Sequence, residues 1–278
     1  MKKVLFAIIA VCFGYPTTGQ QSKPKQGISI STQYHQEYVL DGYVQVREWK
    51  LEGDKMGLKE LGMTGYPVLH LQVCKTFKKG NYFSFIYEQH FMKGNSYFND
   101  EIVYNGTIID GTKGVDVSPT RFFRLKFNYY GNILKNKPWE LQYMVGLVYD
   151  YTIFYLDGEV MPSSPRQEVF ESFGKQALPY PEIGMSGSYL FHKNNTLKMD
   201  VSGTYIPEFK SFFNEGGSMY LHYSTFLADM SYTRKLNPWE FVLGAKLRKV
   251  HLFGESMEDT NDLKMTIAAP YMGIAFWF

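Results

Sequence analysis

Ten ionisable side chains recur at alternating positions along the chain, and their types could do acid–base chemistry or line a path for ions. They are His70, Glu88, His90, Arg124, Lys126, Glu140, Asp150, Asp200, Lys246 and Arg248. Because apolar residues stand between many of them, we expect these side chains to share one interior face. There they would line a polar channel, form a buried catalytic set, or pair with one another to fill a narrow interior. Pairing is the favoured interpretation, because an unpaired buried charge is costly.

No common catalytic motif accompanies these residues. The chain lacks His-Glu-x-x-His, Gly-x-Ser-x-Gly, Walker, dinucleotide-binding and EF-hand patterns. A lipid hydrolase or acyltransferase would need serine, histidine and acidic groups within hydrogen-bond reach of one another at a membrane surface. The residues available for such a set are His90, His222, Ser188, Ser202 and Ser224. Strand register decides whether any of them meet, so the sequence assigns no catalytic residue.

The segment from Gly254 to Asp262 is acidic and contains no basic residue. Its carboxylates would suit divalent cations, but the spacing of a calcium-binding loop is absent. A solvated loop explains the same composition without a ligand. We therefore expect no metal site, and nothing in the sequence calls for a cofactor.

The elements that must position these side chains are β-strands. Apolar and polar residues alternate with a period of two in the segments 69–74, 121–130, 183–191 and 239–248, and this period places successive side chains on opposite faces of a strand. The tripeptide Pro-Trp-Glu opens two such strands, at Trp139 and at Trp239. Proline fits the first residue of a strand, and tryptophan is typical of the membrane–water boundary.

The connections between the predicted strands fall into two classes. Short turns at 78–81, 134–138, 192–196 and 234–238 alternate with longer connections at 53–65, 94–119, 156–180, 207–217 and 254–262. Short turns on one side and long loops on the other are typical of transmembrane barrels. We predict an all-β fold, a transmembrane antiparallel up-and-down β-barrel of 10–12 strands. The alternative is a soluble β-sandwich or lipocalin-like barrel.

The C-terminal segment, Lys264 to Phe278, carries the most specific pattern in the chain. Its alternation Met272-x-Ile274-x-Phe276-x-Phe278, ending on an aromatic residue, resembles the C-terminal signature of Gram-negative outer-membrane β-barrel proteins. The resemblance implies a place in the cell outer membrane, among its lipids and lipopolysaccharide. It also implies that the barrel-assembly machinery reads the terminal motif. Residues expected at the membrane interface or in this motif are Trp139, Trp239, Phe276 and Phe278.

The N-terminus is typical of an exported protein. Two lysines precede an apolar run, residues 4–13, and a small and polar stretch follows it, which predicts a signal peptide over residues 1–19. The run is too short to span a bilayer as a helix. Cys12 raises a lipoprotein alternative, although Val11 suits lipobox cleavage poorly. We divide the rest into an N-terminal segment 20–40, which is a linker, a first strand or a plug, and a barrel over 41–278.

Composition excludes several classes of protein. Loss of residues 1–19 removes Lys2 and Lys3 and no acid, so the formal charge falls from +2 to 0, unlike the basic excess of nucleic-acid binders. Cys74 is then the single cysteine, so no intramolecular disulfide is available. Aromatic residues make up 17% of the chain while its mean hydropathy is −0.26, as in a barrel whose strands alternate lipid-facing and lumen-facing side chains. We expect a monomer.

Three functions are compatible with these patterns. The leading one is a non-enzymatic barrel, either a structural component or a narrow passive channel lined by the ten ionisable residues. The second is an enzyme that modifies phospholipid or lipid A. The third is a surface receptor or adhesin that uses long loops such as 94–119.

A closed barrel should resist detergent, because all its backbone hydrogen bonds are satisfied within the sheet. We expect the detergent-folded protein to migrate on gels as a compact species that shifts to the unfolded position only after heating. A band whose position does not depend on heating would contradict the barrel.

Overall fold

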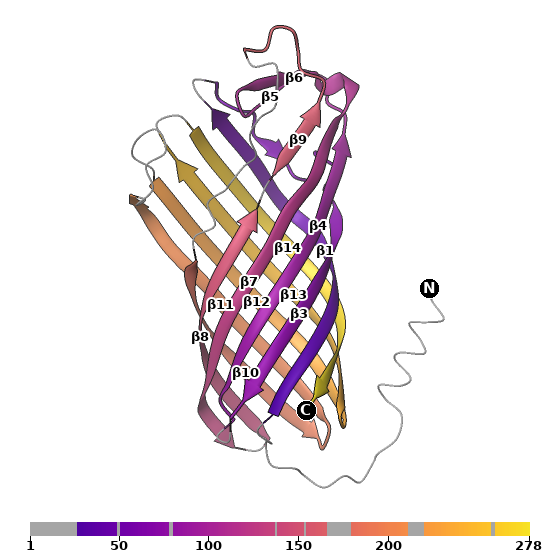
Figure 1. The fold of residues 1–278 in the computed structure, drawn as a ribbon, viewed down its shortest axis with the longest axis vertical. Coiled ribbons are helices and arrows are strands. Elements are labelled where there is room, and N and C mark those ends of the chain that lie inside the picture. The colour runs from indigo at the N-terminus through magenta and orange to yellow at the C-terminus, as the bar shows by residue number, and fades with distance from the viewer. Residues whose placement is uncertain are drawn as a thin grey trace, which may run out of the picture.

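Ten long antiparallel strands form a closed barrel in the computed structural model (Figure 1). Each pairs with its neighbour along the chain, and β14 returns to pair with β1. The strands are β1 (Gly27–Glu48), β3 (Gly65–Thr76), β4 (Tyr82–Ser96), β7 (Val115–Asn136), β8 (Trp139–Thr152), β10 (Tyr180–His192), β11 (Asn195–Lys210), β12 (Tyr220–Leu236), β13 (Trp239–Glu255) and β14 (Asp259–Trp277). The predicted antiparallel barrel is confirmed, with ten strands.

The structure describes most of the chain after residue 26. The described ranges are 27–48, 51–77, 80–136, 138–152, 154–165, 179–210, 220–256 and 259–278. The proposed signal peptide lies outside them. Within these ranges, no helix has the length and the apolar composition needed to cross a bilayer.

Shorter elements gather at the end of the barrel opposite the C-terminus (Figure 1). They are β2 (Met56–Gly57), β5 (Ile102–Tyr104), β6 (Thr107–Ile109), the 3₁₀ helix η1 (Gly111–Lys113) and β9 (Tyr155–Gly158). β2 pairs with β1 and β9 pairs with β7, whereas β5 and β6 form a separate two-stranded sheet. Residues 94–119 therefore supply this hairpin and the ends of β4 and β7. They add no strand to the barrel wall.

A β-bulge reverses the two faces of β1. Val39 pairs with Ile267 and Asp41 with Thr266, so Leu40 is an extra residue in the strand. Odd-numbered residues face inward before the bulge, and even-numbered residues face inward after it. The boundary that we drew at residues 40 and 41 falls at this bulge, inside one strand. Residues 27–40 form the first part of β1.

The outward-facing side chains of the middle of the barrel are largely apolar. Large exposed apolar and aromatic residues occur around the whole circumference, including Ile28, Ile30, Leu69, Leu71, Phe85, Phe127, Val145, Leu147, Ile183, Met185, Met199, Met230, Phe241 and Met272. A continuous apolar surface of this extent suits lipid and would be a liability in water.

The interior has an apolar part and a polar part. Buried apolar side chains from β1, β2, β3, β4, β7, β14 and the connections above them form one cluster, which we call the outer core: Val39, Val44, Val46, Met56, Leu58, Leu61, Met63, Tyr66, Val68, Met92, Ile102, Tyr104, Ile109, Val115, Val117, Phe122, Phe154, Leu156, Leu263, Met265 and Ile267. Toward the short turns, the inward positions carry ionisable and hydroxyl side chains instead. The long connection at 53–65 thus contributes Leu58, Leu61 and Met63 to the interior.

Gly42, just after the bulge, lies where the backbones of β1 and β14 approach each other closely. Its φ is +153°, and an added Cβ would lie 2.4 Å from the carbonyl oxygen of Lys264. We expect Gly42→Ala to lower the free energy of unfolding by about 1–3 kcal/mol, because the backbone must shift and adopt a disfavoured conformation. Urea unfolding in lipid vesicles measures the difference.

Gly187 supplies the matched control. A Cβ there would meet no atom within 4 Å, so Gly187→Ala should change the free energy by less than about 0.5 kcal/mol. Equal effects of the two substitutions would show that the close approach at Gly42 does not constrain the strand.

Candidate functional site

A lysine from β13 bridges two buried glutamates in the middle of the barrel. Lys246 Nζ lies 3.1 Å from Glu37 Oε1 and 3.3 Å from Glu88 Oε1. The glutamates come from β1 and β4, and the side chains of all three residues are less than a tenth exposed. The bridge therefore ties together strands that are not neighbours in the wall.

Two arginines complete the charge balance at this level. Arg248 Nη2 donates to Glu37 Oε2 at 3.1 Å, and its Nη1 lies 3.6 Å from Glu88 Oε2. Arg124 on β7 donates two hydrogen bonds to Asp150 on β8, from Nε to Oδ1 and from Nη2 to Oδ2, the latter at 2.7 Å. This is the bidentate geometry typical of an arginine–carboxylate pair. We call Glu37, Glu88, Arg124, Asp150, Lys246 and Arg248 the charge network. It holds three cations and three carboxylates.

Three histidines line the same level. His70 Nδ1 donates to Glu88 Oε1 at 3.1 Å, because an ionised carboxylate only accepts. His90 Nδ1 lies 3.3 Å from Glu37 Oε2. His35 stacks on His70 and on Tyr271, with ring centroids 5.1 and 4.6 Å apart. The glutamates are thus surrounded by donors on several sides.

A polar cavity of about 210 Å³ lies between the charge network and the short turns. Lys126 donates to Glu182 at 3.0 Å on its wall, and Lys198 Nζ lies 2.9 Å from Asp200 Oδ2. The lining extends down to Glu240, the second residue of β13. This half of the lumen has room for water.

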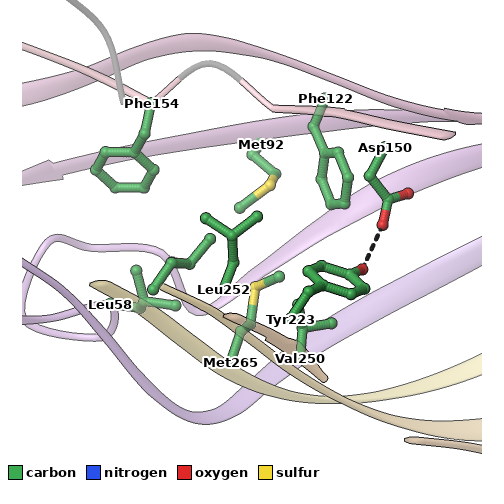
Figure 2. A pocket seen from close by; sticks show the side chains of 10 residues that line it. Leu58, Met92, Phe122, Asp150, Phe154, Tyr223, Val250, Leu252 and Met265 are labelled. Atoms are coloured by element: carbon green, nitrogen blue, oxygen red, sulfur yellow. Dashed lines mark hydrogen bonds between the residues drawn. The ribbon is translucent and has the colours of Figure 1, made fainter. Parts of the chain in front are cut away.

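The other side of the charge network is packed with apolar side chains. Figure 2 shows the residues that converge there, Leu58, Met92, Phe122, Phe154, Val250, Leu252 and Met265. The cavity they enclose is only about 20 Å³, close to the space of a single water molecule. At its edge Tyr180 and Tyr223 both donate to Asp150 Oδ2. The charge network is therefore covered by apolar packing on its outer side.

The structure places the ten predicted residues at three levels of the interior. Seven belong to or border the charge network: His70, Glu88, His90, Arg124, Asp150, Lys246 and Arg248. Lys126 and Asp200 lie on the wall of the polar cavity, each with its own ion-pair partner. Glu140 lies near the turns, 3.5 Å from Lys135 and partly exposed.

Sequence reasoning missed one of the two glutamates that both Lys246 and Arg248 contact. Glu37 is fully buried and lies in the segment that we left as a linker, strand or plug. Its strand alternates weakly, since Gln36 stands on the outward side between Tyr34 and Tyr38. Glu182 and Lys198 were also missed. The available signal was the polar series Gln33, His35, Glu37 at every second position.

The four residues expected at the membrane interface lie on the outside at the turn end of the barrel. The rings of Trp239, Phe276 and Phe278 follow one another with centroids 4.8 Å apart, and Trp139 lies 4.4 Å from Tyr189. The backbone N–H of Phe278 donates to the carbonyl of Ile28 at 2.9 Å. The chain terminus is thereby attached to β1.

Several residues considered for catalysis lie inside the barrel. His90 is buried, Ser202 donates to Glu182 at 3.0 Å, and Ser188 stands on the inward face of β10. Within the described ranges no group of three or more histidine, cysteine or acidic residues is arranged to hold a metal ion. In the acidic segment, Glu255 pairs with Arg47 and Asp262 with His251, while Glu258 lies outside the described residues.

No protein-family model matches the chain, and no curated protein matches it significantly. Among solved structures, the outer membrane protease OmpT from Escherichia coli superposes with a TM-score of 0.53 at 11% identity, over 94% of this chain and 100% of that one. The translocator domain of the autotransporter NalP from Neisseria meningitidis gives 0.44 at 12% identity, over 100% and 94%. Neisserial surface protein A gives 0.32 at 6% identity, over 90% and 97%.

The likeness to OmpT shows the fold alone, because the identity is low. It confirms the resemblance seen in the sequence, since the chain has the architecture of an outer-membrane β-barrel. The activity of that neighbour does not transfer to this chain.

Removing one carboxylate from the charge network should be strongly destabilising. We expect Glu37→Gln to lower the free energy of unfolding by about 3–5 kcal/mol, because Lys246 and Arg248 would remain buried with too few partners. Glu140→Gln is the control, since its pair with Lys135 is partly exposed and should contribute no more than about 1 kcal/mol. A Glu37→Gln variant as stable as the control would refute a structural role for the network.

Proposed function

We propose that this chain is an integral outer-membrane β-barrel with a closed lumen, a structural membrane component rather than a passive channel. The observation that carries the proposal is the charge network covered by the outer core. All six side chains of the network are less than a tenth exposed, and apolar side chains cover them on the side of the long connections.

The energetics of an ion entering this lumen favour closure. An ion moving from the polar cavity would have to displace the pairs formed by Lys246, Arg248 and Arg124. It would then enter apolar packing with space for about one water molecule and lose its hydration there. Each step is unfavourable, so opening requires a rearrangement of the interior.

Three observations support the outer-membrane location. The outward surface is a belt of apolar side chains, the chain ends in the pattern from Met272 to Phe278, and the architecture is that of outer-membrane barrels. In this location the short turns face the periplasm and the elements β5, β6 and β9 face outward. Its partners would be lipids, lipopolysaccharide and, during biogenesis, the barrel-assembly machinery, with the mature protein a monomer.

The receptor or adhesin function has less support. The segment 94–119 was expected to supply a free binding loop, yet Ile102, Ile109, Val115 and Val117 from it are buried in the outer core. Much of this connection therefore contributes to closing the barrel.

Planar-bilayer conductance of the detergent-folded protein tests closure. We expect no steady current steps from preparations that show heat-dependent gel migration, while a porin added to the same bilayer conducts. Steady ion-selective steps from the wild-type protein would contradict the proposal and would make Arg124, Lys126, Lys246 and Arg248 the lining of a pore.

A further inference from the structure

Five outward-facing residues form a row across five neighbouring strands near the outer end of the barrel. Strand register places Tyr205 opposite Ser224, Ser224 opposite His251, His251 opposite Lys264, and Lys264 opposite Tyr43. Residues on either side of each member, such as Tyr223, Val250 and Leu263, are buried inside. The row therefore faces the surroundings of the barrel and is separate from the lumen.

The row lies at the upper edge of the apolar belt. On β13 the outward residues are apolar from Trp239 to Leu247, and Lys249 and His251 follow. At about 3.3 Å per residue and a tilt of about 40°, this apolar run rises roughly 20 Å, near the height of about 25 Å expected for the hydrocarbon-facing band. His251 is consequently at the level where lipid headgroups and acyl esters lie.

An acidic residue orients the histidine. His251 Nε2 donates to Asp262 Oδ1 at 3.1 Å, and Tyr43 donates to the other carboxylate oxygen, Oδ2, at 2.8 Å. With its proton on Nε2, the neutral imidazole presents Nδ1 as an acceptor. The histidine thus has the orientation and the tautomer that a general base requires.

A serine stands directly across from this histidine. Ser224 on β12 is paired with His251 in the β12–β13 register, so their Cβ atoms lie at about 4.5–5.5 Å as for any opposed pair. Its hydroxyl has no hydrogen-bond partner among the described residues. Rotation about its Cα–Cβ bond gives Oγ three staggered positions, and catalytic hydrogen bonds commonly tighten only when substrate is bound.

We propose that Ser224, His251 and Asp262 form a catalytic set on the outer surface of the barrel that hydrolyses acyl esters of glycerophospholipids in the surrounding leaflet. The proposal rests on the outer-membrane location proposed above. Ser224 is the nucleophile, His251 the general base and acid, and Asp262 the group that holds the imidazole.

The reaction balances with water as the second substrate. Ser224 Oγ attacks the ester carbonyl carbon while His251 Nδ1 takes the hydroxyl proton. The carbon–oxygen bond to glycerol breaks, His251 returns the proton to the departing lysophospholipid, and the acyl group stays on Ser224. Water then attacks this ester, His251 accepts its proton and gives it back to Ser224, and the fatty acid leaves.

Lysines around the row account for the choice of a phosphate-bearing lipid. Backbone amides of the strands are engaged in the sheet, so the oxyanion and the phosphate must be met by side chains. Lys249 is one diagonal step from Ser224, since it pairs with Phe226. Lys264 lies opposite His251, and its Nζ is 5.6 Å from the ring of Tyr43, which Lys55 covers at 3.7 Å. Lys249 thus borders the proposed nucleophile, while Lys264 and Lys55 lie farther along the row, beside His251 and Tyr43.

The test uses the refolded full-length chain in mixed micelles with phosphatidylethanolamine. We expect wild-type protein to release free fatty acid and lysophospholipid. Ser224→Ala and His251→Ala should each reduce the rate at least about 1,000-fold, and Asp262→Asn about 100-fold to 10,000-fold. Thr225→Ala, the adjacent residue on the inward face, is the matched control and should keep the wild-type rate.

A fluorophosphonate probe gives a second readout that does not depend on the lipid. We expect it to modify wild-type protein, with the adduct mapped by mass spectrometry to Ser224, and to modify the His251→Ala variant far more slowly. Because the mapping uses wild-type protein, it remains decisive even if Ser224→Ala fails to fold. No adduct at Ser224 and no fatty acid release from folded wild-type protein would overturn the proposal.

The lysines are tested by comparing two substrates. Lys249→Gln should slow hydrolysis of phosphatidylethanolamine about fivefold and leave a neutral nitrophenyl ester unaffected. Equal effects on both substrates would contradict the assignment of a phospholipid substrate but not the assignment of Ser224 as nucleophile.

Bilayer conductance separates this proposal from the proposed closure of the lumen. A barrel that conducts ions and hydrolyses lipid through Ser224 would refute closure but not the hydrolase. A barrel that neither conducts nor hydrolyses lipid would refute the hydrolase but not closure.

Discussion

Closure of the sheet between β14 and β1 is the constraint on which the rest of the structure depends. In a bilayer, each backbone N–H and C=O must find its partner within the protein, and a barrel without edges satisfies them all. The two strands pair from Ser29–Trp277 to Glu48–Asp259, across the bulge at Leu40. The bond from Phe278 to Ile28 extends the pairing to the last residue. The aromatic C-terminus is thus part of the seam that closes the wall.

The ten-stranded wall encloses a narrow interior, and side chains occupy its middle and its outer part in two ways. Toward the long connections, apolar side chains of the outer core exclude water. In the middle, the charge network satisfies its three cations with three carboxylates. The buried charges are stable because each has a partner of opposite sign, and the apolar side chains are stable because they are kept from water. The polar cavity lies beyond the charge network, toward the short turns.

The outer surface differs from the interior in where its polar side chains lie. There the belt of apolar residues explains membrane insertion, but the row that contains Ser224 and His251 is polar and lies where that belt ends. The Asp262 carboxylate beside that row accepts hydrogen bonds from both Tyr43 and His251, so its position depends on β1, β13 and β14 together. A rigid wall with side chains fixed in register is a suitable support for chemistry on lipids.

The sequence by itself determined the class of fold and the face of most residues, because the period of two is local and each strand reports it independently. It placed Arg124, Lys126, Lys246 and Arg248 on the face opposite their apolar neighbours, where they lie. Only the tertiary structure decided which of these residues meet. Arg248 contacts Glu37 from 211 positions away, and Ser224 faces His251 through strand register. One extra residue, such as Leu40, reverses the faces of everything that follows it in a strand, so these contacts follow from how the barrel closes.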